Sequence, residues 1–104
     1  MAAKTRAHTL VIAIRLDGKE DWRQRFTRGD LAQRYAQEIA ESLARTWVAN
    51  CAAGRPGGEV RDIVVIHSAT GEQLGHWNVP DIADTARLAM RHRIIRRART
   101  AVVR

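Results

Sequence analysis

Hydrophobic and polar residues alternate near the start of the chain, which predicts a strand over residues 8–16. In the segment HTLVIAIRL, leucine and isoleucine occupy the even positions from Leu10 to Leu16, and smaller or polar residues occupy the odd ones. A repeat of two residues is typical of a half-buried strand, because successive side chains point to opposite faces. We expect the leucine and isoleucine face to be the buried one.

The next segment, EDWRQRFT, alternates aromatic and basic residues and predicts the second strand of a hairpin. Two registers compete. A two-residue turn at Asp17-Gly18 has the stronger local signal, but it places the basic residues of the second strand beside the leucine and isoleucine face. A three-residue loop that includes Lys19 brings the aromatic residues there instead. Its pairs are Ile14 with Trp22 and Leu10 with Phe26. Because burial sets the register of a half-buried hairpin, we expect the three-residue loop.

Apolar residues then recur every three or four positions from residue 31 to residue 48, which predicts a long amphipathic helix. Thr27 and Asp30 resemble a capping box at its start, and we expect the helix to end near Asn50. The larger residues of its apolar stripe are Leu31, Tyr35, Ile39, Leu43 and Trp47, with alanines at 32, 36, 40 and 44 beside them.

A second hairpin is predicted where RDIVVIHS and EQLGHWNV flank a turn that contains Gly71. A three-residue loop with a left-handed glycine fits this spacing. Its pairs are Ile66 with Leu74 and Ile63 with Trp77. After these strands, Asn78 is a suitable N-cap, and Pro80 fits the first turn of a closing helix.

The element order is therefore ββαββα, and the predicted fold class is α+β. We expect a four-stranded antiparallel sheet, one long helix packed on one of its faces, and a basic C-terminal helix. The 104 residues suit a single domain. Within it, residues 1–80 form the predicted core, and residues 81–104 form the C-terminal helix.

The excess positive charge is confined to the end of the chain. The formal net charge is +7, yet Met1 to Asp84 contains eleven Lys or Arg and eleven Asp or Glu. Thr85 to Arg104 contains seven arginines and no acidic residue. A block of like charge on one segment, unlike charge spread over a whole surface, indicates an anionic partner.

The closing helix has two apolar faces that do not line up. Its first half, Asp81 to Met90, presents one apolar cluster, and arginines continue that face further along the helix. Burying the whole stripe would bury guanidinium groups at a high cost in free energy. We therefore expect the first half to dock on the core, and the second half to project or to contact a second subunit. The expected dimer contacts are Ile94, Ile95, Ala98 and Val102.

These features lead to a first hypothesis, that the chain is a small non-enzymatic protein that binds DNA or RNA. We expect it to be a homodimer in the cytoplasm. Arginine's planar fork suits phosphate oxygens, and each phosphate contact releases counterions. The expected nucleic-acid-binding residues are Arg91, Arg93, Arg96, Arg97, Arg99 and Arg104. A secondary basic surface is expected at Arg15, Arg23 and Arg25, on the sheet face away from the core and beside Val11 and Ala13.

Three alternatives compete with this hypothesis. The arginines can form an ordinary solvated end of a helix. They can instead dock on an acidic protein surface, as an adaptor or a phage- or plasmid-type inhibitor would. A membrane-surface helix fits worst, because the tail has no Trp or Phe, and no Leu after Leu88, to insert into lipid.

Nothing in the sequence predicts catalysis, a cofactor or a metal site. His67 and His76 lie on the two strands of one predicted hairpin, but the register points them to opposite faces, and no further ligand completes a tetrahedral set. We expect Cys51 to be a small buried residue, and we assign the three tryptophans to packing. A single cysteine and the lack of a long apolar run lead us to expect a cytoplasmic protein without membrane contact.

Overall fold

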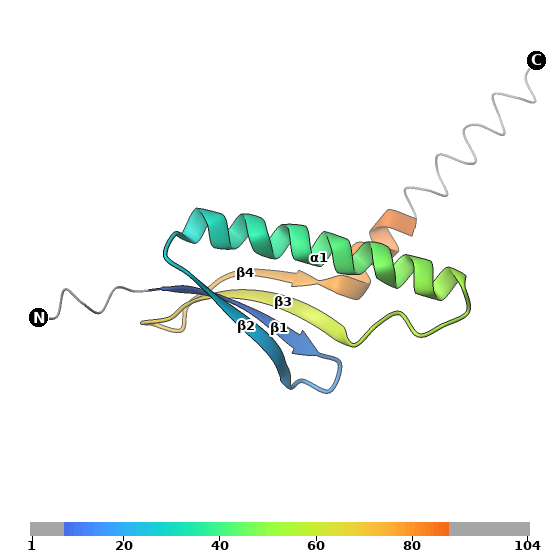
Figure 1. The fold of residues 1–104 in the computed structure, drawn as a ribbon, viewed down its shortest axis with the longest axis horizontal. Coiled ribbons are helices and arrows are strands. Elements are labelled where there is room, and N and C mark those ends of the chain that lie inside the picture. Colours follow the sequence, from blue (N-terminus) through green and yellow to red (C-terminus); the bar gives the residue numbers. More distant parts are fainter. Residues whose placement is uncertain (1–7, 88–104) are drawn as a thin grey trace, which may run out of the picture.

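The computed structural model of the chain describes residues 8–87 and confirms the expected α+β class. Its strands form one antiparallel sheet in the order β2-β1-β3-β4, and helix α1 lies across one face of that sheet (Figure 1). The elements are β1 (Thr9–Arg15), β2 (Glu20–Phe26), α1 (Gly29–Ala52), β3 (Val60–His67) and β4 (Gln73–Asn78), and residues 79–87 are helical.

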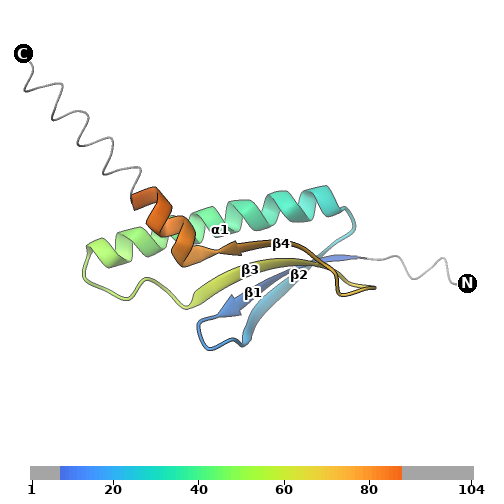
Figure 2. The ribbon, with the colours of Figure 1, turned by 180° about the vertical axis from the view of Figure 1, so that it is seen from behind.

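Both helical parts of the described chain lie on the same side of the sheet. Figure 2, which shows the molecule from behind, places α1 and the helical residues 79–87 on one side of the four strands, as Figure 1 does. Val79 and Ala83 bring the second helical part into the core, where both are fully buried. No described element covers the opposite side of the sheet.

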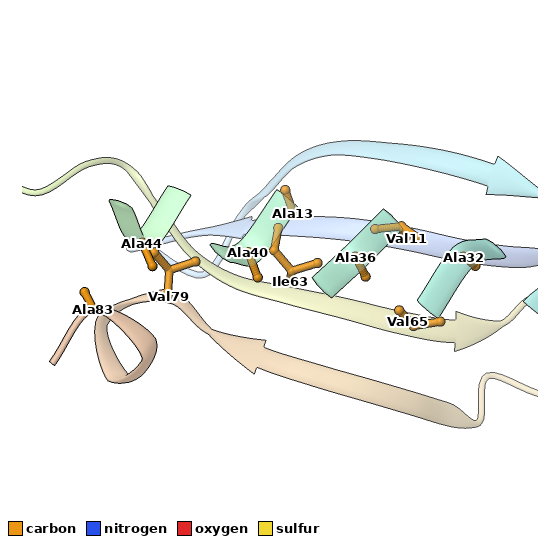
Figure 3. Packing of buried hydrophobic residues seen from close by; sticks show 10 residues of the cluster. All are labelled: Val11, Ala13, Ala32, Ala36, Ala40, Ala44, Ile63, Val65, Val79 and Ala83. Carbon is orange, nitrogen blue, oxygen red and sulfur yellow. The ribbon is translucent and has the colours of Figure 1, made fainter. Parts of the chain in front are cut away.

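Alanines form the most deeply buried part of the predicted apolar stripe of α1. Ala32, Ala36, Ala40 and Ala44 are buried, whereas Leu31 at the start of the larger stripe is 41% exposed. Small side chains let the helix approach the sheet closely, and Figure 3 shows the alanines directly above the central strands. The strand residues below them are Val11, Ala13, Ile63 and Val65. The larger residues of α1, from Tyr35 to Trp47, pack around this layer at partial burial.

The first hairpin corrects both the expected register and the expected buried face. Val11 and Ala13 are fully buried, whereas Leu10, Ile12 and Ile14 are half-buried. Thr9 pairs with Phe26 and Ala13 with Trp22. The predicted pairs of Ile14 with Trp22 and Leu10 with Phe26 are therefore wrong. The aromatic rings of β2 lie on the side of α1, and they bring the odd-numbered residues of β1 to that side with them.

A bulge explains how a three-residue loop coexists with this register. The loop has three residues, as expected, but it spans residues 16–18 and excludes Lys19, because Arg15 N–H donates to the Lys19 carbonyl at 2.8 Å. Gly18 has a φ of 86°, the left-handed conformation that such a loop requires. The pairing then shifts by one residue between Ala13 and Ile14. Because of this extra residue on β2, its aromatic side chains lie on the opposite face from the one they would occupy in a regular strand.

The second hairpin agrees with the sequence except at its turn. Ile63 pairs with Trp77, as expected, and Gly71 has a φ of 74°. The expected pair of Ile66 with Leu74 is wrong, because the register shifts after Val65 and Ile66 pairs with Gln73. The loop is also one residue longer than predicted, since His67 N–H donates to the Glu72 carbonyl at 2.8 Å.

The two helix starts differ in how they are capped. The expected capping box of Thr27 and Asp30 does not form: α1 has no side-chain cap, and Asp30 instead accepts a hydrogen bond of 3.1 Å from Arg28 Nε. The second helical part is capped as predicted, because Asp81 N–H donates to Asn78 Oδ1 at 3.0 Å. None of the helices in residues 8–87 has the length and apolar character needed to cross a bilayer.

Candidate functional site

The side of the sheet opposite α1, called the open face below, carries an aliphatic strip along its two central strands. The register pairs Leu10 with Ile66 and Ile12 with Val64, so these side chains lie next to one another on this face. All of them are only partly buried, and none packs against the core on the α1 side. The strip consists of Leu10, Ile12, Ile14, Val64 and Ile66.

Two arginines border this strip on the β2 edge. Arg23 pairs with Ile12 and Arg25 pairs with Leu10, so both guanidinium groups lie on the open face. They face away from the core, as expected, but their neighbours are not the Val11 and Ala13 that the sequence indicated. Arg23 Nε donates to Glu20 Oε2 at 2.9 Å, and this hydrogen bond lowers the pKa of the Glu20 carboxyl.

Arg15, the third member of the expected secondary basic surface, does not join the other two. It pairs with Val60, which packs against the core on the α1 side, at the hairpin end of β1. Its guanidinium lies 3.9 Å from the Asp17 carboxylate and 3.8 Å from that of Glu59. The structure therefore brings together Arg23 and Arg25 only.

A buried carboxylate lies on the central strand β3, at one end of the aliphatic strip. Asp62, which pairs with Ile14 on β1, is only 6% exposed. Its Oδ2 accepts a hydrogen bond of 2.7 Å from Arg61 Nε, and its Oδ1 accepts bonds from His76 Nε2 at 2.7 Å and Asn78 Nδ2 at 3.0 Å. We call Arg61, Asp62, His76 and Asn78 the Asp62 cluster.

The Asp62 cluster holds its carboxyl in the ionised form. Burial alone would raise the pKa of Asp62, but the hydrogen bonds from Arg61, His76 and Asn78 outweigh it, so the pKa lies below its usual value. All three donors come from β3 and β4, whose register places them around the carboxylate. The cluster thus links β4 to β3 at this end of the sheet, and both oxygens of the carboxylate have hydrogen-bond donors.

The residues of the expected nucleic-acid site lie outside the described part of the chain. This holds for Arg91, Arg93, Arg96, Arg97, Arg99 and Arg104, and for the expected dimer contacts Ile94, Ile95, Ala98 and Val102. Residues 8–87 contain ten Lys or Arg and all eleven Asp or Glu, so the described part has a slight excess of acid. The excess positive charge of the protein is carried by the eight basic residues beyond it.

The described part of the chain pairs many of its own charges. Arg15, Arg23, Arg28, Arg61 and Arg87 each have a carboxylate within 4 Å. In all five, such a carboxylate belongs to a residue no more than three positions away, as in Arg87, whose guanidinium lies 3.9 Å from Asp84. Half of the ten Lys or Arg in residues 8–87 therefore lie beside a carboxylate, and the formal net charge of this part is close to zero.

The described residues hold no group of side chains that could bind a metal ion. His67 and His76 fall on opposite faces of the β3–β4 hairpin, as the sequence predicted, and residues 8–87 contain no cluster of three or more potential metal ligands. Cys51 is exposed near the end of α1, which corrects the expectation that it is buried. Trp22, Trp47 and Trp77 pack against the core, as expected.

Sequence reasoning missed both the aliphatic strip and the Asp62 cluster, although one signal for the strip was present. The runs LVIAI in β1 and IVVI in β3 are almost continuously apolar, which is typical of strands with apolar side chains on both faces. Nothing local marks Asp62, since its partners reach it only through the β3–β4 pairing. Comparison of the chain with protein-family models, with curated proteins and with solved structures finds no match.

Proposed function

We propose that this protein is a small, non-enzymatic nucleic-acid-binding protein, in which the arginine-rich segment of residues 88–104 contacts the phosphates of DNA or RNA. The ββαββ domain is the scaffold that carries this segment. The proposal depends on one observation: the described domain balances its charges internally, and the excess positive charge lies almost entirely in this segment.

A run of arginines without acidic residues is stabilised by a polyanion. Six arginines lie within residues 88–104, and like charges three or four positions apart repel one another in a helix. Phosphates remove this repulsion and release condensed counterions, which favours binding at low salt. The paired arginines of the domain would gain less, because each already has a carboxylate nearby.

Fluorescence anisotropy with labelled duplex DNA and single-stranded RNA, measured over a range of salt concentrations, tests the proposal. We expect salt-dependent binding that weakens by at least about tenfold in the triple variant Arg93→Ala, Arg96→Ala, Arg97→Ala. The slope of log affinity against log salt should fall by about two to three, since about 0.7 to 0.9 counterion is released per phosphate contact.

A matched control removes the same charge from the domain instead. Arg34, Arg45 and Arg55 are exposed and form no ion pair within residues 8–87. Replacing these three with alanine should leave most of the affinity in place. Equal losses in the two triple variants would show that only net charge matters, and an unchanged affinity in the first variant would refute the assigned site.

The competing function, docking on an acidic protein surface, is separated by a second measurement. A pull-down from nuclease-treated native cells would then recover a defined protein partner, and random duplex would bind with little affinity. Loss of the recovered material on nuclease treatment would instead agree with the nucleic-acid proposal.

A further inference from the structure

The open face carries the apolar side chains that are typical of a buried sheet face, although no described residue covers it. β1 and β3 carry buried side chains toward α1, among them Val11 and Val65, and aliphatic side chains on the opposite side as well. An apolar sheet face normally packs on a further layer. We propose that a second copy of this chain covers it, so that two open faces pack together in a homodimer.

The chemistry of the face favours another sheet over nucleic acid. Its centre is aliphatic, and the aromatic residues of the sheet strands, Trp22, Phe26 and Trp77, pack on the α1 side instead. Proteins that bind single-stranded nucleic acid stack its bases on aromatic side chains, and the described residues place no aromatic side chain on this face. Two aliphatic sheet faces can instead interdigitate about 10 Å apart, as in a β-sandwich.

The chain's own C-terminal segment is a less suitable cover. Residues 79–87 lie on the α1 side, so the chain passes residue 87 on the side away from the open face (Figures 1 and 2). In addition, Arg23 and Arg25 border the face, and they would repel a segment that carries six arginines and no acid. A second open face brings no such charge excess.

The size of the face suits a reversible dimer. Four strands about 4.8 Å apart and six to seven residues with a rise of about 3.4 Å give a footprint of about 400 Å² for each copy. Two copies together bury about 800 Å², counted as flat footprints without the additional surface of the side chains. That total lies below the about 1,200 Å² at which stable specific interfaces begin, in the range of weak, transient ones, so we expect a weak dimer that dissociates on dilution.

The charges at its edges select one orientation of the two copies. A twofold axis parallel to the strands places β1 of one copy over β3 of the other, and β2 over β4. The aliphatic strips then meet, and the edge with Arg23 and Arg25 lies over β4 of the other copy, not over the same two arginines. An axis across the strands would place β2 over β2 and set arginine against arginine, which costs free energy.

Sedimentation equilibrium of the full chain without nucleic acid, over a wide concentration range, tests the dimer. We expect a reversible monomer–dimer equilibrium in the wild-type protein. Ile12→Lys places a charge at the centre of the strip and should raise the dissociation constant by about 100-fold or more. The control Leu31→Lys adds the same charge at an exposed site on α1 and should leave the constant unchanged.

A milder variant keeps the test informative if Ile12→Lys fails to fold. Val64→Thr preserves the shape and the strand preference of the side chain, and it should raise the dissociation constant by about tenfold. A wild-type protein that stays monomeric at every concentration would overturn the proposal. So would a dimer that persists in folded Ile12→Lys and Val64→Thr proteins.

The orientation has its own readout. In a dimer mixed from labelled and unlabelled copies, intermolecular NOEs should connect the Ile12 methyl groups with those of Val64 in the other copy. Contacts confined to β1 with β1 would contradict the axis parallel to the strands. Since mass and NOEs are measured without nucleic acid, the dimer can fail while the proposed function stands, and the reverse also holds.

Discussion

At the scale of single residues, Asp62 shows how sheet pairing turns an ordinary acidic residue into a structural one. It lies in a strand that is otherwise almost wholly apolar, and it is 6% exposed. A carboxylate can be buried there because Arg61, His76 and Asn78 satisfy its oxygens. The cost of removing the charge from water is thus offset by charge-assisted hydrogen bonds.

Replacing Asp62 with asparagine should therefore lower the free energy of unfolding by about 1 to 3 kcal/mol near neutral pH, because the three charge-assisted hydrogen bonds to its carboxylate are weakened or lost. The folded pKa of Asp62 lies below its unfolded value. Its stabilising effect is then complete above about pH 4 and is lost as the pH falls through the lower, folded pKa. Urea titrations of both proteins from neutral to acidic pH measure this.

The control for this prediction is Asp21→Asn, which changes an exposed acidic residue at the bulge of β2. It should change the free energy of unfolding by no more than about 0.5 kcal/mol. A stability difference between the wild-type and Asp62→Asn proteins that stays constant into the acidic range would contradict the assigned role of the carboxylate.

At the scale of the element, α1 shows that the size of the buried side chains matters as much as their spacing. The sequence carries two parallel stripes, one of large residues and one of alanines, and both fit a helix of this length. The alanines face the sheet because only small side chains allow α1 to lie close to β1 and β3 (Figure 3). The large residues then close the sides of this thin core.

Enlarging one of these alanines should consequently destabilise the fold. Ala40 is fully buried against the sheet, so Ala40→Leu should lower the free energy of unfolding by about 1 to 3 kcal/mol through overpacking. Ala49→Leu, at an exposed position of the same helix, should change it by no more than about 0.5 kcal/mol. Denaturant midpoints and m-values measure both. Similar losses in the two variants would indicate that helix preference, and not packing, is responsible.

At the scale of the whole molecule, the two proposals combine into one architecture. In the proposed dimer the α1 layers lie outside and the sheets inside. Because the twofold axis runs parallel to the strands, both copies of the helical residues 79–87 begin at the same end of the dimer. Two arginine-rich segments then start at the same end of the dimer, one on each outer face, and a nucleic acid that spans both binds the second segment at a raised effective concentration once the first has bound.

This architecture predicts that dimerisation strengthens binding only to nucleic acids long enough to reach both segments. Ile12→Lys should weaken binding to a long duplex by about tenfold or more, and leave binding to a duplex that fits one segment nearly unchanged. Anisotropy with duplexes of increasing length, at fixed salt, measures this. A loss that does not depend on length would show that the two segments act separately.

The sequence by itself determined the elements, the ββαββ order, the α+β class and the location of the excess charge. These follow from periodicity, turn residues and composition, which act between neighbours in the chain. Only the tertiary structure decided which face of β1 is buried, which stripe of α1 meets the sheet, and that Asp62 is enclosed. Both faces of β1 are apolar. Which of them is buried depends on the bulge that sets the face of Trp22 and Phe26, and on how closely α1 can approach the sheet. Those are contacts between segments far apart in the chain, and local pattern does not encode them.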